Sequence, residues 1–73
     1  MMFDRVKKVI PEGIVFDIFN PGSGGIRIHL RLKDERHGPR VVIAMSWKEF
    51  DDKTDEQLRT IITEGTRELR EGR

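Results

Sequence analysis

Residues 26–33 alternate apolar and basic side chains without interruption, in the order Ile-Arg-Ile-His-Leu-Arg-Leu-Lys. A β-strand has a side-chain period of two, so the apolar residues share one face and the basic residues share the other. The apolar residues are Ile26, Ile28, Leu30 and Leu32, and the basic residues are Arg27, His29, Arg31 and Lys33. The segment therefore predicts a strand with one face in a core and an opposite face that carries positive charge and no acid.

A second strand is expected over residues 14–19, where apolar residues again alternate. The loop over residues 20–25, Asn-Pro-Gly-Ser-Gly-Gly, joins it to the alternating strand as a hairpin. A one-residue slip in this hairpin would put Asp17 in the core, so parity fixes the pairing. We therefore expect Asp17 beside Arg27 or His29, and Phe19 among the basic residues.

Two further strands are predicted. Residues 40–45 contain five successive apolar residues, typical of a strand that is covered on both faces. A single helix covers one face only, so Val42 and Ala44 require a further cover, and we expect a homodimer to provide it. Residues 3–10 are interpreted as a strand because Val6, Val9 and Ile10 precede Pro11, although the apolar spacing also fits a helix.

The remainder of the chain has helical patterning. Residues 46–49 and 54–57 both match the capping box, which leaves open two helices or one helix with an irregular start. Trp47 is expected in the core and Gly65 at a close approach to the sheet or to another helix. The apolar stripe consists of Trp47, Phe50, Leu58, Ile61, Ile62, Gly65 and Leu69. The expected fold is one small α+β domain over residues 1–73, with a four-stranded antiparallel sheet followed by a C-terminal helix packed on one face.

Composition excludes several classes of site. The chain has 73 residues and no cysteine, so disulfides and cysteine-based zinc sites are absent. His29 and His37 stand in no metal-ligand spacing, and the carboxylates of the helical region resemble a solvated face. We therefore expect no metal, no cofactor and no enzymatic activity. No segment has the apolar length of a membrane span or a signal-peptide core, which favours a cytoplasmic location.

Charge is divided along the chain, although its net value is only +1. Residues 1–48 carry nine Lys/Arg and five Asp/Glu, whereas residues 49–73 carry five Lys/Arg and eight Asp/Glu. A basic sheet beside an acidic helical region favours an anionic partner. The leading hypothesis is a nucleic-acid-binding module that prefers single strands with little sequence specificity. Its expected contacts are Arg27, His29, Arg31, Lys33, Arg40 and Phe19.

Other interpretations remain open. The basic row is also typical of a solvated strand face or of an edge that charge protects against aggregation. The alternative function is a protein-interaction or structural subunit whose basic face meets an acidic partner. A third is a regulator that binds a small anion at the sheet face. Phe19 fits a loop-anchoring role as well as base stacking.

Residues 12 to about 50 resemble the single-strand DNA-binding coactivators called the transcriptional positive cofactor four family. The resemblance rests on residues 14–19, a glycine-containing turn, the Arg-bearing strand 26–33, a polar turn with Gly38, and residues 41–45 followed by Ser-Trp-Lys-Glu-Phe. It implies a homodimer formed through helices and fourth strands, with DNA contacts at Arg27, Arg31, Lys33 and Arg40. The departures are the glycine-rich loop, the short turn before Val41 and the second capping box.

Overall fold

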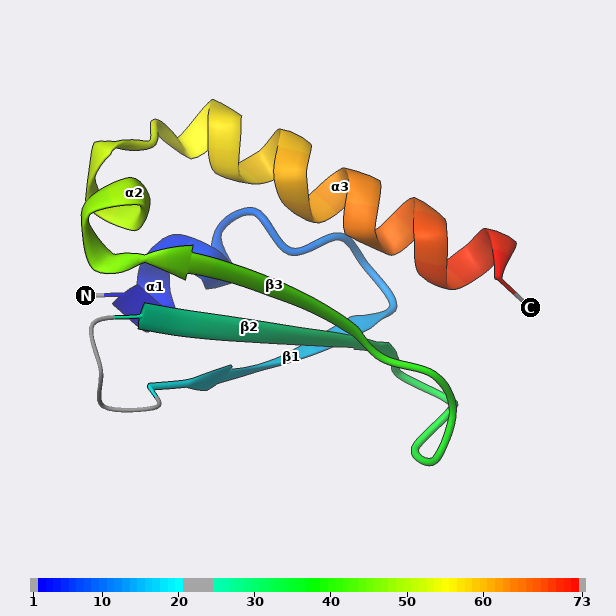
Figure 1. Cartoon of the computed structure of the whole chain (residues 1–73). Coiled ribbons are helices and arrows are strands. Elements are labelled where there is room, and N and C mark those ends of the chain that lie inside the picture. Colours follow the sequence, from blue (N-terminus) through cyan, green and yellow to red (C-terminus); the bar gives the residue numbers. More distant parts are fainter. Residues whose placement is uncertain (1, 21–24, 73) are drawn as a thin grey trace.

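The computed structural model describes residues 2–20 and 25–72, with side chains from Asp4 onward, and these form three helices and three strands. The strands make one antiparallel sheet in the order β1-β2-β3, and α3 crosses one face of it (Figure 1). The α+β class is as expected. The elements are α1 (Met2–Lys7), β1 (Ile14–Phe19), β2 (Gly25–Leu32), β3 (Val41–Ser46), α2 (Trp47–Asp52) and α3 (Asp55–Glu71).

The predicted strand over residues 3–10 is wrong, and the described sheet therefore has three strands and not four. Residues 2–7 form α1, and a backbone hydrogen bond from Val9 to the carbonyl of Val6 (3.0 Å) continues the turn. Val6 and Val9 are three residues apart, so a helical turn places both on one side, where both are buried. Burial of this helical face outweighs the strand propensity of the β-branched residues.

The hairpin register agrees with the parity argument. Asp17 pairs with His29, and Phe19 pairs with Arg27. The apolar residues of β1 therefore lie beside those of β2 on the covered face, with Phe16 opposite Leu30. β2 is bounded by Gly25 and Leu32, within one residue of the expected strand. Residues 21–24 of the glycine-rich loop lie outside the described part of the chain.

The core lies between the sheet and the helices. Ile28 and Leu30 of β2 are fully buried, as are Leu58 and Ile62 of α3. Gly65 brings α3 close to the sheet: a Cβ added there would lie 3.2 Å from Cδ1 of Leu30 and 3.3 Å from Cγ1 of Val41. The expected close approach at Gly65 is thus confirmed, and it is an approach to the sheet.

Two capping boxes separate α2 from α3, which resolves the open alternative in favour of two helices. Glu49 N–H donates to Ser46 Oγ (3.0 Å), and Gln57 N–H donates to Thr54 Oγ1 (3.1 Å). Each N-cap N–H donates in return to the third-residue side chain. These bonds satisfy N–H groups that a helix start leaves without intrahelical partners.

Phe50, and not Trp47, is the aromatic core residue of α2. Phe50 is 2% exposed, whereas Trp47 is half-buried and outside the buried cluster. Lys53 is extended (ψ 140°), so the helical phase of α2 does not continue into α3. The prediction that one apolar stripe continues through both helices is therefore wrong, and with it the expected core position of Trp47.

Arg5 fastens α1 to the junction between α2 and α3. Its guanidinium donates to the carbonyls of Phe50 (2.8 Å) and Lys53 (2.6 Å), and lies 4.6 Å from the Phe50 ring centroid. Lys8 Nζ donates to Asp55 Oδ2 (3.1 Å), and this bond lowers the pKa of the Asp55 carboxyl. The first basic residues of the chain thus hold the helical layer together.

Candidate nucleic-acid interface

One face of the sheet carries no helix in the described part of the chain, since α3 and the connection from α1 to β1 lie on the other side (Figure 1). We call this surface the open face. The strand parity places on it every second residue of each strand. Its residues are Val15, Asp17 and Phe19 of β1, Arg27, His29 and Arg31 of β2, and Val42 and Ala44 of β3.

The basic row runs along the central strand of this face. Arg27, His29 and Arg31 alternate with fully buried apolar residues, so the expected two-sided character of β2 is confirmed. Alternate residues of a strand are about 7 Å apart. The three side chains therefore line a span of about 14 Å along the middle of the sheet.

The aromatic side chain predicted among the cations is exposed. Phe19 has 49% of its surface accessible, and its ring centroid lies 4.5 Å from that of His29, with the ring planes at 57°. Arg27 is its cross-strand partner. One side of the ring therefore contacts His29, while about half of the residue remains available to a ligand.

The two arginines of the row are held differently. Arg27 is exposed, and no hydrogen bond or ion pair joins its side chain to another described residue. Arg31 is half-buried, and its guanidinium donates to the carbonyls of Leu32 (3.3 Å) and Lys33 (3.4 Å). A guanidinium has five N–H donors, so Arg31 keeps donors for a ligand. Arg27 is the more accessible of the two cations.

Lys33 and Arg40 lie beyond the strands. β2 ends at Leu32 and β3 begins at Val41, so both residues belong to the connection between them, at one end of the open face. Both are exposed. The backbone N–H of Lys33 donates to the carbonyl of Gly13 (2.9 Å), which fixes the start of this turn. Four of the six expected contacts thus share the open face, and these two flank it.

Carboxylates are sparse in the strands of the open face, although the connection that carries Lys33 and Arg40 also carries Asp34 and Glu35. Asp17 is the one acidic residue within β1, β2 and β3, and it sits opposite His29. The acidic residues of 49–71 belong mainly to α2 and α3. The predicted separation of a basic sheet from an acidic helical layer is therefore present in three dimensions, and it favours an anion at the open face.

Apolar residues of β3 complete the open face. Val42 is 49% exposed and Ala44 is exposed, because the helices cover the opposite side of the strand. The five successive apolar residues over 41–45 predict such an exposed apolar patch when one side of the strand has no cover. Val15 of β1 lies opposite Arg31 on the same face, as the alternation of residues 14–19 predicts.

Neither a metal centre nor a membrane span accompanies this surface in residues 2–20 and 25–72. No cluster of three or more His, Cys, Asp or Glu side chains there has the arrangement that a metal ion needs. None of the described helices combines the length and apolar character required to cross a bilayer.

Comparison with known proteins gives no relative. The chain matches no family model, and neither the curated proteins nor the solved structures include one with significant similarity to it. The resemblance to the single-strand DNA-binding coactivators therefore rests on the quoted residues alone. The function has to be argued from the open face itself.

Proposed function

We propose that the protein is a non-enzymatic nucleic-acid-binding module that uses the open face to bind single strands with little sequence specificity. The observation that carries the proposal is the exposed Phe19 ring beside the basic row, on a sheet face whose strands hold one acid, Asp17. Cations neutralise phosphates whatever the base, and an aromatic ring stacks on any base.

Each expected contact has a role in this proposal. Arg27 is the principal phosphate ligand, because it is exposed and opposite Phe19 in the register. Arg31, Lys33 and Arg40 extend the positive surface toward one end of the sheet. Phe19 offers its exposed side to a base, and such stacking contributes about 1–3 kcal/mol per base. Single strands are favoured because a duplex keeps its base faces stacked inside.

An acidic protein is the competing partner, since it meets the same cations. The exposed aromatic ring favours the nucleic acid, because Phe19 then has a flat apolar surface to cover. Self-association through the open face is disfavoured, because Arg27 and Arg31 of two copies would face each other across the contact. These features support an anionic ligand with planar apolar groups.

The test is a fluorescence-anisotropy titration with labelled single-stranded and duplex oligonucleotides at two salt concentrations. We expect tighter binding to the single strand and a slope of log affinity against log salt of about −2, as for roughly three neutralised phosphates. The Arg27→Ala, Arg31→Ala double variant should flatten this slope and stay folded. Arg59→Ala, an exposed cation of α3, is the matched control and should bind like the parent.

If the parent shows no binding below about 100 µM at low salt, in the weak range of non-specific complexes, the nucleic-acid proposal is rejected. An acidic protein partner then becomes the better explanation of the open face. If the double variant binds as tightly as the parent, the basic row is not the binding surface.

We also propose a homodimer formed through the free edge of β3. The strand order leaves this edge without a partner strand in the described sheet. β3 contains no charged residue and no proline, two features by which edge strands commonly avoid pairing. A second β3 running antiparallel would cover the exposed sides of Val42 and Ala44 and the half-buried Val41 and Ile43.

Electrostatics permits this edge-to-edge arrangement. The basic rows of the two copies would lie three strand spacings apart, one from β2 to β3 in each copy and one between the two β3 strands. At about 4.8 Å per spacing, the rows are separated by about 14 Å. That exceeds the screening length of about 10 Å at 0.1 M salt. The two open faces would then join as one continuous surface.

Light scattering at micromolar concentration tests the assembly. The expected mass is twice the 8.5 kDa of the chain. Val42→Lys places a charge at an exposed edge position and should return the mass to one chain without unfolding it. A parent protein that scatters as a single chain would rule out the dimer.

A further inference from the structure

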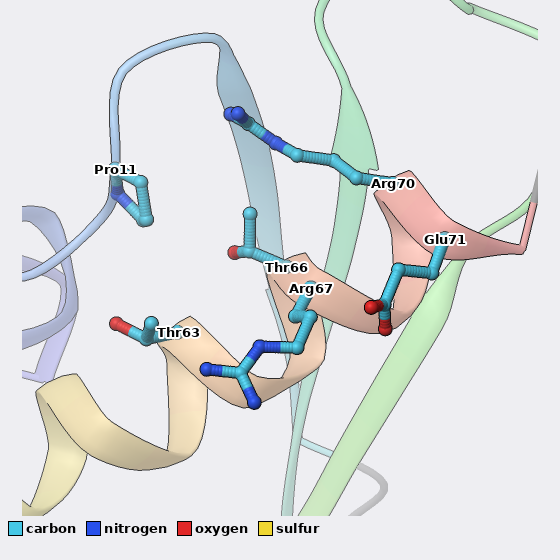
Figure 2. Close-up of a pocket in the computed structure, with 6 residues that line it drawn as sticks. All are labelled: Pro11, Thr63, Thr66, Arg67, Arg70 and Glu71. Atoms are coloured by element: carbon cyan, nitrogen blue, oxygen red, sulfur yellow. The ribbon is translucent and has the colours of Figure 1, made fainter.

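A hollow of about 360 Å³ lies on the helical side of the molecule, between the second half of α3 and Pro11. Figure 2 shows Arg67 and Arg70 reaching from α3 toward the side on which Pro11 lies. The volume falls within the range of small-molecule sites, near its lower end. The lining residues are Pro11, Thr63, Thr66, Arg67, Arg70 and Glu71.

The two arginines of the hollow differ in their partners. Arg70 Nη2 donates to the carbonyl of Glu12 (3.2 Å), which ties the loop before β1 to α3. Arg67 makes no hydrogen bond or ion pair with any residue in the described part of the chain. None of its five N–H donors is therefore used by the described residues.

Pro11, Thr63 and Thr66 give the hollow its apolar surface. Thr66 is buried, and its hydroxyl donates to the carbonyl of Ile62 (2.9 Å). The ring of Pro11 and the methyl groups of Thr63 and Thr66 supply carbon surface next to the guanidinium groups. A pocket with a carbon floor and a charged rim fits a molecule with an apolar body and a charged end.

We propose that this hollow binds a small organic carboxylate, with its carboxylate on Arg67 and its apolar body against Pro11 and the threonines. A planar guanidinium pairs with a carboxylate through two parallel hydrogen bonds. Two arginines and one glutamate line the hollow, so its charge favours an anion. Glu71 opposes the anion and limits the affinity.

This site is independent of the open face. The hollow is lined mainly by residues of α3. α3 lies on the side of the sheet opposite to the open face (Figure 1). The inference therefore does not rest on the proposed nucleic-acid binding, and either can fail without the other. A carboxylate and a nucleic acid would bind to opposite sides of one molecule.

The experiment is an NMR titration of the full ¹⁵N-labelled chain with benzoate, acetate and benzyl alcohol at matched ionic strength. Benzoate should bind saturably, with a Kd on the order of 1–10 mM for so small a ligand, and should shift the signals of Thr63, Thr66 and Arg67. Acetate lacks the apolar body and benzyl alcohol lacks the charge, so both should bind more weakly. Equal affinity for benzoate and either comparison compound, or no saturation by benzoate, overturns the proposal.

Variants of exposed residues test the assignment of the charged groups. Arg67→Gln keeps a helix-forming residue and should weaken benzoate binding about tenfold, as the loss of a charge-assisted pair implies. Glu71→Gln should tighten binding, by about twofold for an exposed like charge. Arg59→Gln, elsewhere on α3, is the control and should leave the affinity unchanged. Benzoate binding that is unaffected by Arg67→Gln places the carboxylate elsewhere and refutes the site.

Discussion

The ring of Phe19 lies 4.5 Å from the imidazole of His29, centroid to centroid, across the β1–β2 pair. The contact joins the only exposed aromatic side chain in the described strands to the centre of the basic row. The contact holds the Phe19 ring against His29 on the open face, and about half of the Phe19 surface stays accessible. In the proposed complex, base stacking on Phe19 and phosphate contacts of the basic row would therefore occur side by side.

Phe19→Ala should weaken single-strand binding by about 1–3 kcal/mol, the contribution of one stacked base. The stability should change by less than about 1 kcal/mol, because half of the side chain is already exposed. Anisotropy titrations and urea melts measure the two effects separately. Phe19→Leu keeps apolar area without an aromatic face, so it should bind like the alanine variant. A large loss of stability with unchanged binding would show that Phe19 only anchors the hairpin.

Gly65→Val should destabilise the fold by about 1–3 kcal/mol, the usual cost of overpacking a core. A Cβ at Gly65 already meets Leu30 at 3.2 Å and Val41 at 3.3 Å, so two further methyl groups have no room. Gly65→Ala is the graded comparison: its helix propensity gain of about 1 kcal/mol opposes the milder contact. Urea unfolding gives both values. A valine variant as stable as the parent would mean that α3 can move away from the sheet.

Phe50→Ala should cost about 3–5 kcal/mol, whereas Trp47→Ala should cost clearly less. Phe50 is almost completely buried and also carries the guanidinium of Arg5 over its ring, while Trp47 is half-buried outside the core. Thermal melts of the two variants compare them directly. Equal losses, or a greater loss for Trp47→Ala, would contradict the assignment of Phe50 as the anchor of α2.

Acid should remove a contribution of Asp55 to stability. The hydrogen bond and charge of Lys8 lower the pKa of this carboxyl below its ordinary value. A lowered pKa in the folded state gives stability that is complete above the pKa of the unfolded state and is lost as the pH falls through the folded-state value. Asp55→Asn should therefore be less stable than the parent at pH 7 and equally stable at pH 2.

The partner of Asp55 supplies the control for this pH dependence. Lys8→Met should produce part of the same loss at pH 7, because Arg5 also faces Asp55 at 3.8 Å and keeps its own attraction. Adding Lys8→Met to Asp55→Asn should cost little further stability, because the partner of Lys8 is then already absent. Urea melts across the carboxyl range measure all four proteins. If the difference in free energy of unfolding between the parent and Asp55→Asn is the same at pH 7 and pH 2, the ion pair is excluded as its cause.

The strands were predictable because their side-chain period is unambiguous. The alternation of β2 placed Arg27 and His29 on one face, and the need to keep Asp17 out of the core fixed the register. Phe19 on the basic face followed from the same parity. The position of four of the six candidate contacts on the open face therefore follows from the strand period and the hairpin register alone.

The errors arose where local pattern was ambiguous or interrupted. Val6 and Val9 suit a short strand and a short helix equally, and only tertiary burial decides between them. Trp47 was misplaced because the extended Lys53 resets the helical phase. The hollow at Arg67 was not predictable, since Pro11 approaches α3 only through the fold.

The most direct measurement is an NMR map of the surface that a short single-stranded oligonucleotide touches at low salt. Shifts should gather on Phe19, Arg27, His29 and Val42 of the open face, and the exposed side of α3 should remain unchanged. Raising the salt concentration should reverse them, because phosphate contacts are released. Shifts centred on α3, or no shifts in the presence of the oligonucleotide, would contradict nucleic-acid binding by the open face.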